Sequence, residues 1–275
     1  MEKCVNQFFI YDGEILKNID FKETMISSGK SIYEVIRVIE GVPLFLEEHL
    51  ERLINSIKIS NLTLSSNASD IKRNILKLIE INESLEGNIK IVFNYVNDDN
   101  KFIAYFINHS YPTKEQYKNG VTTALFYGER NNPNAKVINL DFRNTVDREI
   151  KEKNVYEAIL IDNEGNVTEG SKSNIFMVKG NVVITAPIDA VLPGITRQSI
   201  IDVCNDLDIE VKEENVSVKK LLAMDGIFIS GTSPKVLPVN AIYDKSHFNS
   251  NNKIILSIMN GYDEKIQHYI DKHKI

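Results

Sequence analysis

The spacing of apolar residues predicts a mixed α and β segment over the first hundred positions. Apolar residues from Leu46 to Ile57 recur every three or four positions, which is the stripe of an amphipathic helix. The same spacing from Ile71 to Ile79 predicts a second helix, and we expect Ser69 to cap its first turn. Short apolar runs bounded by turn residues predict strands at 7–11, 31–38, 89–96 and 102–107. This block is therefore predicted to be α+β with neighbouring antiparallel strands.

The pattern changes after residue 110, and residues 111–120 are mostly polar, so we predict an interdomain linker there. Beyond it, helices are predicted at 141–153, 196–207 and 253–272. Strands are predicted at 121–126, 156–161, 173–178, 227–230 and 236–239. The chain is thus predicted to be an α/β protein, with a small α+β domain at 1–110 and a larger α/β domain at 121–275.

Composition excludes several classes of protein. Hydrophobic residues make up 43% of the chain and charged residues 25%, which are ordinary values for a globular protein rather than a disordered one. The net charge is −6 and no basic stripe is visible, so we expect no nucleic-acid partner. Apolar runs are far shorter than the roughly 20 residues of a membrane span, and no secretory leader is visible. Cys4 and Cys204 lie far apart. We expect a cytoplasmic protein without a metal site.

Two stretches place polar residues at the ends of predicted elements. Gly194 comes just before the helix at 196–207 and permits an unusual backbone turn there, while Thr196 offers a hydroxyl. Free N–H groups at a helix start suit a phosphate, although an ordinary capped helix has the same sequence. Glu169 lies where one predicted strand ends and another starts, so its carboxylate either faces a site or caps a loop. The motifs of serine hydrolases, P-loop proteins and Rossmann domains are missing.

Several motifs fit one further pattern. Three of them are Glu169-x-Ser171-x-x-Asn174-Ile175-Phe176, Val183-x-Thr185 and Leu192-x-Gly194-Ile195-x-Arg197. Others are Tyr33-Glu34-x-x-Arg37, Glu48-His49-Leu50-x-Arg52-Leu53 and Gly231-Thr232. Together they resemble the class IV aminotransferases, pyridoxal-phosphate enzymes that include branched-chain and D-amino-acid aminotransferases and aminodeoxychorismate lyase. The resemblance covers about residues 8–245.

The resemblance implies the two-domain fold of D-amino-acid aminotransferase, which is fold type IV of the pyridoxal-phosphate enzymes. It also implies pyridoxal 5′-phosphate as cofactor, an amino acid and a keto acid as substrates, and a homodimer. The family binds its cofactor through a lysine, and Lys136 stands where the family has it, about 20 residues before Tyr156. A lysine suits this role because its amine becomes nucleophilic at neutral pH when it is desolvated.

Other residues receive roles from the same resemblance. Arg52 is expected to offer its planar fork to the cofactor phosphate, the alternative being a surface arginine paired with Glu48. Glu169 is expected to lie against the pyridine nitrogen and keep it protonated, because a cationic ring is the stronger electron sink. The remaining cofactor-binding residues are expected to be Ser173, Asn174, Leu192, Ile195, Thr196 and Thr232. Among these, Leu192 either packs on the ring or is ordinary core.

The substrate side matches no subgroup of the family. D-amino-acid aminotransferases have an Arg and a His after the strand at 89–96, whereas this chain has Asn-Asp-Asp-Asn at 97–100. Branched-chain enzymes have a tyrosine after the lysine and an arginine on that strand, and this chain has neither at 138–140 or 94–95. The Arg-Gly-rich loop of the lyases is missing too. Tyr33, Arg37 and Arg143 are the expected substrate-side residues.

We therefore expect an enzyme that moves an amino group between an α-amino acid and an α-keto acid, with a branched-chain or related amino acid as substrate. The first alternative is aminodeoxychorismate lyase, which forms 4-aminobenzoate and pyruvate and needs the same cofactor site. The second alternative is a non-catalytic binding protein that retains the fold. Visible absorbance from a bound cofactor would exclude this second alternative.

Overall fold

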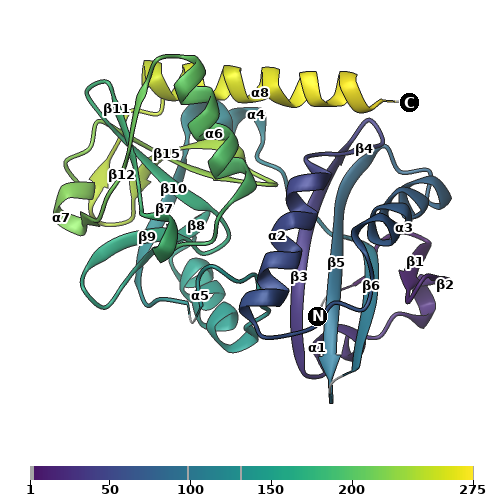
Figure 1. Ribbon diagram of the computed structural model, residues 1–275. Coiled ribbons are helices and arrows are strands. Elements are labelled where there is room, and N and C mark those ends of the chain that lie inside the picture. The colour runs from purple at the N-terminus through teal and green to yellow at the C-terminus, as the bar shows by residue number, and fades with distance from the viewer. Residues whose placement is uncertain (1–2, 98, 131, 275) are drawn as a thin grey trace. The chain divides into compact units, whose positions relative to one another are not determined.

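The computed structural model describes residues 3–97, 99–130 and 132–274, and the chain forms two compact units. Unit 1 comprises Met1–Ser110, Ala135–Ile138 and Ile266–Ile275. Unit 2 comprises Tyr111–Asn134 and Asn139–Lys265. Figure 1 shows the elements of both units along the chain. Among the described residues, no helix is long and apolar enough to cross a membrane, and no cluster of His, Cys, Asp and Glu could hold a metal ion.

Unit 1 is built on a six-stranded sheet in the order β2-β1-β6-β5-β3-β4, in which all neighbouring strands are antiparallel. The strands are β1 (Phe8–Tyr11), β2 (Glu14–Lys17), β3 (Lys30–Ile39), β4 (Val42–Pro43), β5 (Glu86–Val96) and β6 (Asp99–Ile107). The helices are η1 (Asn18–Asp20), α1 (Thr24–Ser27), α2 (Leu46–Ile59) and α3 (Ala68–Ile81). Because side chains alternate along a strand, Ile91 packs with α2 and α3 while Val92 packs with α1 on the other face.

The two predicted helices of this unit form, with one correction. Leu46, Leu50, Leu53 and Ile57 of α2 are buried in the core, as the apolar stripe requires. The predicted cap of α3 at Ser69 is wrong. The helix begins after Asn67, whose extended backbone lets its side chain accept the N–H of Asp70 at 2.9 Å.

Unit 2 is built on a ten-stranded mixed sheet in the order β12-β11-β10-β14-β15-β7-β8-β9-β13, with β16 paired to β15. The strands are β7 (Val121–Tyr127), β8 (Glu157–Ile161), β9 (Asn166–Gly170), β10 (Asn174–Lys179), β11 (Val182–Thr185), β12 (Glu210–Glu213), β13 (Val216–Ser217), β14 (Gly226–Gly231), β15 (Lys235–Ile242) and β16 (Ser246–His247). The helices are α4 (Lys114–Asn119), α5 (Leu140–Glu152), η2 (Ile188–Ala190), α6 (Ile195–Asp206), α7 (Val218–Leu221) and α8 (Lys253–His273), of which the residues from Ile266 onward belong to unit 1.

Strand β9 closes part of this sheet on itself. It pairs with β8 on one side and with β10 on the other, where Glu169 faces Asn174. The strands β10, β14, β15, β7, β8 and β9 therefore form a closed barrel around an apolar core. The sequence pattern predicted only a turn before the strand at 173–178, so it missed β9.

The segment 111–120, expected to be a linker, lies in unit 2 and carries α4. Thr113 begins this helix with a capping box: its hydroxyl accepts the N–H of Gln116, and the Gln116 side chain accepts the N–H of Thr113. Its polar residues therefore reflect a solvated helix. Ala135–Ile138 and Ile266–Ile275, which we expected in the C-terminal domain, lie in unit 1.

Candidate active site

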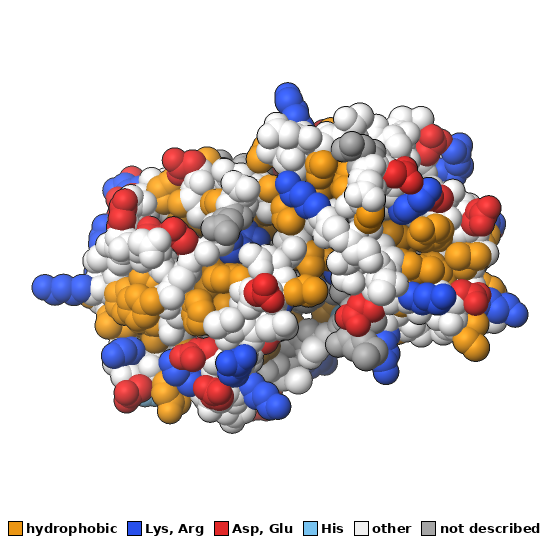
Figure 2. Space-filling view, turned by 90° about the horizontal axis from the view of Figure 1, so that it is seen from below, with side chains coloured by type: hydrophobic (Ala, Val, Ile, Leu, Met, Phe, Trp, Pro, Cys, Tyr) orange, Lys and Arg blue, Asp and Glu red, His pale blue; other side chains and the backbone are white. Residues whose placement is uncertain are grey.

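The predicted site residues fall in both units, so the site is described unit by unit. Unit 1 holds Tyr33, Arg37, Arg52 and Lys136. Unit 2 holds Arg143, Glu169, Ser173, Asn174, Leu192, Ile195, Thr196 and Thr232. On the face of the molecule shown in Figure 2, basic and acidic side chains are interspersed, and neither sign forms a continuous stripe.

The main chain around Lys136 is fixed between β3 and α2. The carbonyl of Lys136 accepts the N–H of Tyr33 at 3.1 Å, and the N–H of Ile138 donates to the carbonyl of Ser31 at 3.0 Å. The N–H of Lys136 donates to the buried hydroxyl of Ser56 at 3.2 Å. This backbone pairing explains why Ala135–Ile138 belongs to unit 1, and it gives Lys136 a rigid base.

The ring of Tyr33 lies close to two ammonium groups. The Nζ atom of Lys136 is 5.1 Å from the ring centroid and the Nζ atom of Lys90 is 4.8 Å from it, both within cation–π range. Lys90, on β5, is only 6% exposed. Sequence reasoning missed Lys90, although a single lysine inside the apolar run Ile89–Phe93 was a usable signal because lysine is almost never fully buried without a partner.

Helix α2 presents its polar stripe to a buried carboxylate of β3. Arg52 donates through Nε to Oε1 of Glu34 at 2.7 Å and through Nη2 to Oε2 at 2.6 Å. Nδ1 of His49 lies 2.8 Å from Oε2 of Glu34. The exposed fractions are 0% for Glu34, 3% for His49 and 8% for Arg52. Arg52 is therefore buried, so it is not the surface arginine paired with Glu48 that the sequence left as the alternative.

The charges of Glu34 and His49 follow from their burial and from the hydrogen bonds and charges around them. Burial alone would raise the pKa of Glu34, but the Arg52 guanidinium and the hydrogen bonds from Arg52 and His49 hold it well below its usual range. Burial lowers the pKa of His49, so its ring is neutral at pH 7 and Nδ1 donates to the carboxylate. The group thus contains one ion pair, which His49 orients.

In unit 2, Glu169 stands near the end of β9 as a buried carboxylate that accepts hydrogen bonds at both oxygens. Its Oε1 accepts from Nε of Arg130 at 2.8 Å, and its Oε2 accepts from the N–H of Leu192 at 3.1 Å. Arg130 in turn donates through Nη2 to the carbonyl of Pro133 at 3.0 Å. Sequence reasoning missed Arg130, which stands in a polar stretch without any pattern that distinguishes it.

Asn174 holds the turn before α6 from its other side. Its Nδ2 donates to the carbonyl of Leu192 at 3.0 Å, so Asn174 and Glu169 bind the two sides of one residue. A Cβ atom on Gly194 would lie 2.0 Å from Oδ1 of Asn174. The expected unusual backbone at Gly194 is wrong, since its φ of −67° and ψ of 131° are ordinary. Glycine is required here for the close approach of Asn174.

The first turn of α6 is available to an anion. Its N-cap is Gly194, which makes no side-chain cap, so the N–H groups of Ile195 and Thr196 are not occupied by a capping side chain. The buried Thr196 hydroxyl lies 3.4 Å from the hydroxyl of Tyr262 on α8. Thr232, half-buried, lies in the turn between β14 and β15.

A second buried carboxylate, missed from the sequence, organises the turn between β9 and β10. Oε1 of Glu157 accepts from the N–H of Lys172 at 2.6 Å and from the hydroxyl of Ser173 at 3.0 Å. Burial raises the pKa of Glu157, and these hydrogen bonds act in the opposite direction. A Cβ atom on Gly170 would lie 2.6 Å from the same oxygen. The hydroxyl of Ser173 thus binds inside the turn.

The remaining predicted residues are half-buried. Leu192 lies just before α6, and its main chain binds Glu169 and Asn174. Arg37 lies on β3 and Arg143 on α5, which places them in different units.

Comparison with known proteins identifies the family. The family model described as "Amino-transferase class IV" matches residues 31–242. The chain belongs to the class IV aminotransferases. This class IV aminotransferase is 29% identical to the D-alanine aminotransferase of Bacillus licheniformis over 249 residues, which are 85% of this chain and 87% of that protein. It is 24% identical to the aminodeoxychorismate lyase of Bacillus subtilis (strain 168) over 259 residues, 88% of this chain and 87% of that protein.

A solved structure confirms the fold. The branched-chain aminotransferase from the archaeon Thermoproteus uzoniensis, solved with norvaline, matches this class IV aminotransferase with a TM-score of 0.87 at 24% identity. The match covers 98% of this chain and 97% of that chain. The predicted family, the α/β fold class and the prediction that the protein is an enzyme are therefore confirmed.

Proposed function

We propose that this protein is a pyridoxal-phosphate-dependent transaminase that moves an amino group between an α-amino acid and an α-keto acid. The observation that carries the proposal is the placement of Lys136, whose main chain is held by β3 and by Ser56 of α2. One turn of α2 before Ser56 stands the buried Arg52. A nucleophilic amine and a guanidinium are the groups that an aldehyde cofactor with a phosphate requires.

Each unit, taken by itself, has groups whose chemistry suits part of pyridoxal phosphate. The amine of Lys136 suits the aldehyde, and the buried carboxylate of Glu169 suits the ring nitrogen. The uncapped first turn of α6 and the guanidinium of Arg52 suit the phosphate, with Thr232 as a further hydroxyl donor. When bound, the cofactor withdraws electrons from the bonds at the substrate Cα.

The protein's own residues then supply position and proton transfer. Glu169 holds the proton at the ring nitrogen, and the charge-assisted bond from Arg130 keeps its carboxylate in place. Asn174 holds the turn at Leu192, which would keep the first turn of α6 in place to bind a phosphate. The amine of Lys136 takes the proton from the substrate Cα, as a general base mounted on a fixed backbone.

A branched-chain or related L-amino acid is the proposed substrate. Tyr33, Arg37 and Arg143 are the proposed substrate-side residues, and Lys90 joins them because its ammonium lies against the Tyr33 ring. The acidic segment 97–100, of which Asp98 lies outside the described residues, is a poor partner for a substrate with two carboxylates. We further propose a homodimer in the cytoplasm, on the resemblance to the family.

Peptide mapping tests the cofactor lysine. Borohydride reduction of the purified protein is expected to fix a phosphopyridoxyl group on Lys136. A label on Lys30, Lys101 or Lys172 would contradict the assignment, and each of them lies in a peptide distinct from that of Lys136. Lys136→Ala is expected to lower turnover about 10²- to 10⁴-fold, the usual contribution of a general acid–base group.

Half-reactions separate a transaminase from the lyase, which remains the second candidate because a relative named as such is 24% identical. Single amino acids of both L and D series are added to the pyridoxal form, and its visible absorbance is followed. A transaminase converts that form with at least one amino acid. If none converts it while aminodeoxychorismate releases pyruvate, the protein is the lyase.

A further inference from the structure

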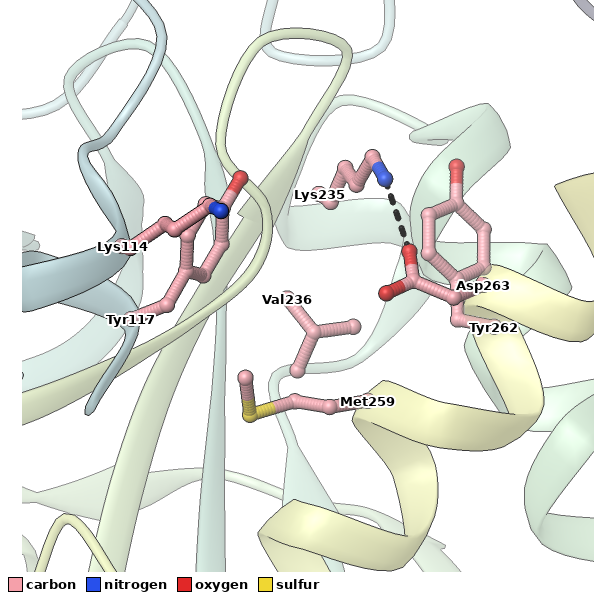
Figure 3. A pocket seen from close by; sticks show the side chains of 7 residues that line it. All are labelled: Lys114, Tyr117, Lys235, Val236, Met259, Tyr262 and Asp263. Carbon is pink, nitrogen blue, oxygen red and sulfur yellow. Dashed lines mark hydrogen bonds and ion pairs between the residues drawn. The ribbon is translucent and has the colours of Figure 1, made fainter.

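A cavity in unit 2 contains none of the predicted site residues. Its volume is about 260 Å³. It is lined by Lys114 and Tyr117 of α4, Lys235 and Val236 of β15, and Met259, Tyr262 and Asp263 of α8. Figure 3 shows α4 side chains on one side, Lys235, Asp263 and Tyr262 on the other, and Val236 and Met259 between them. The volume is below the roughly 300–1,000 Å³ of drug-sized ligand pockets, so it suits a small molecule.

The side chains that line the cavity include two cations, Lys114 and Lys235, and one anion, Asp263. Nζ of Lys235 and Oδ1 of Asp263 lie 2.8 Å apart and cancel each other. Lys114 forms no ion pair with any described residue. It stands in the first turn of α4, where the helix dipole disfavours a cation, so helix stability does not explain its position. A ligand with a single negative charge balances the lining.

The rest of the cavity is suited to an apolar body. Val236 is buried and Met259 is half-buried, and a methionine adapts to ligands of irregular shape. The rings of Tyr117 and Tyr262 flank these two residues (Figure 3). Together with the charge of the exposed Lys114, this lining favours a small apolar monocarboxylate over a neutral molecule of the same shape.

The cavity is connected to two elements of unit 2 that we propose to bind the cofactor phosphate. The hydroxyl of Tyr262 lies 3.4 Å from that of Thr196 in the first turn of α6. The hydroxyl of Tyr117 donates to the carbonyl of Pro234 at 3.1 Å, in the turn that carries Thr232. Lys235, which ends this turn, has a left-handed φ of 54°, a conformation that costs energy for a residue other than glycine.

We propose that this cavity is a regulatory site for a small apolar monocarboxylate, and that an occupant alters how firmly α6 and the Thr232 turn hold the cofactor phosphate. Branched-chain keto acids are members of this chemical class. Binding at the cavity is independent of the proposed transaminase activity. Only its effect on the cofactor rests on that proposed function.

The binding test uses 4-methylpentanoate, which has the required charge and body but no amino or keto group that reacts. Calorimetric titration of the holoenzyme is expected to show binding that weakens about two- to fivefold in Lys114→Gln, the loss of one exposed ion pair. Met259→Trp, which fills the cavity, should weaken it at least about tenfold. Lys118→Gln is the matched control, since Lys118 lies on the same helix outside the lining.

The neutral isostere 4-methylpentanamide should bind the wild-type protein several-fold more weakly than 4-methylpentanoate. If 4-methylpentanoate does not bind the wild-type holoenzyme, the proposed site is wrong. Wild-type affinity in both Lys114→Gln and Met259→Trp would place the ligand elsewhere and overturn the site. Equal binding of the amide would overturn the proposed ligand class. These readouts do not depend on catalytic turnover, so a protein that proves inactive as a transaminase still gives an answer.

The regulatory effect is measured as the rate at which pyridoxal phosphate leaves the protein, with and without 4-methylpentanoate. We expect a change of about twofold or more in the wild type. Tyr262→Phe removes the contact with Thr196, so it should still bind the probe while the change in rate is lost. Binding without any change in the wild-type rate would overturn the regulatory role.

Discussion

Arg52 in unit 1 is held by a charged side chain of a neighbouring element, whereas Glu169 in unit 2 is held both by a charged side chain, that of Arg130, and by a main-chain N–H group. Arg52 makes two bonds to Glu34, and both residues are buried. Glu169 binds the N–H of Leu192, and Gly194 nearby has no room for a side chain. The first arrangement therefore depends on charge and pH, and the second combines an ion pair with a close fit of the main chain at Gly194.

This difference follows from the elements that carry the residues. In unit 1 a helix lies on the sheet, so long side chains must bridge between them, and a buried carboxylate is stable there only with a paired cation. In unit 2 a strand, a tight turn and a helix start meet at Glu169 and Asn174, where the barrel closes. Backbone groups are close enough there to bond directly, and glycine permits it.

The largest expected effect comes from breaking the ion pair between Arg52 and Glu34. Arg52→Ala leaves Glu34 buried without its paired cation, which should lower the free energy of unfolding by about 3–5 kcal/mol. Cofactor affinity should also fall about 10- to 150-fold. Urea unfolding and cofactor titration measure the two effects. The control is the double variant Glu34→Gln, Arg52→Met, which removes both charges and should be less destabilised. Wild-type stability in Arg52→Ala would contradict the ion pair.

The stability of the turn between β9 and β10, which follows Glu169, should depend on the hydrogen bonds to Glu157 rather than on its charge. Glu157→Ala leaves the N–H of Lys172 and the hydroxyl of Ser173 without their acceptor, at a cost of about 1–3 kcal/mol. Glu157→Gln keeps an oxygen for both donors, so it should recover most of that loss in stability and in cofactor affinity. If both variants lose the same amount, the charge of Glu157 matters and its role as an acceptor does not.

A shape test follows at Gly194. Gly194→Ala places a Cβ atom against Asn174, and overpacking of this kind costs about 1–3 kcal/mol. The double variant Gly194→Ala, Asn174→Ala removes the oxygen that is struck, so it should be more stable than the sum of the single variants predicts. Thermal unfolding of the four proteins gives the coupling. Additive losses would show that the two residues are not in contact.

The smallest effect concerns pH and unit 1. The pKa of His49 is lower in the folded protein than in the unfolded chain, so below about pH 6.5 the unfolded chain takes up a proton that the folded protein excludes. Stability should therefore fall as the pH drops from 7 toward 5. At lower pH, protonation of Glu34 removes a further contribution. His49→Gln should flatten the first decline, whereas His268→Gln, an exposed control in the same unit, should not. A decline unchanged in His49→Gln would contradict this assignment.

Much of this protein could be predicted from local patterns. The spacing of apolar residues predicted α2 and α3, because the apolar stripe of a helix consists of residues only three or four positions apart in the sequence. The motif around Glu169 and the motif at Leu192–Arg197 identified the family because each lies within a few consecutive residues. The cap of α3 and the helix in segment 111–120 were not predicted. Near α3 more than one polar residue can cap a helix, and a polar stretch is typical of a solvated helix as well as of a linker.

The amino-acid sequence by itself determined the family, the fold class and the helices α2, α3, α5, α6 and α8. Only the tertiary structure decided that Lys136 pairs with β3, that Arg52 binds Glu34, and that Glu169 meets Asn174 where the barrel closes. These contacts join separate secondary-structure elements, and the residues near each contact in the sequence do not show which faces of those elements pack together. The register of a strand and the burial of a charge depend on the partner that packs against them, and that partner exists only in the folded chain.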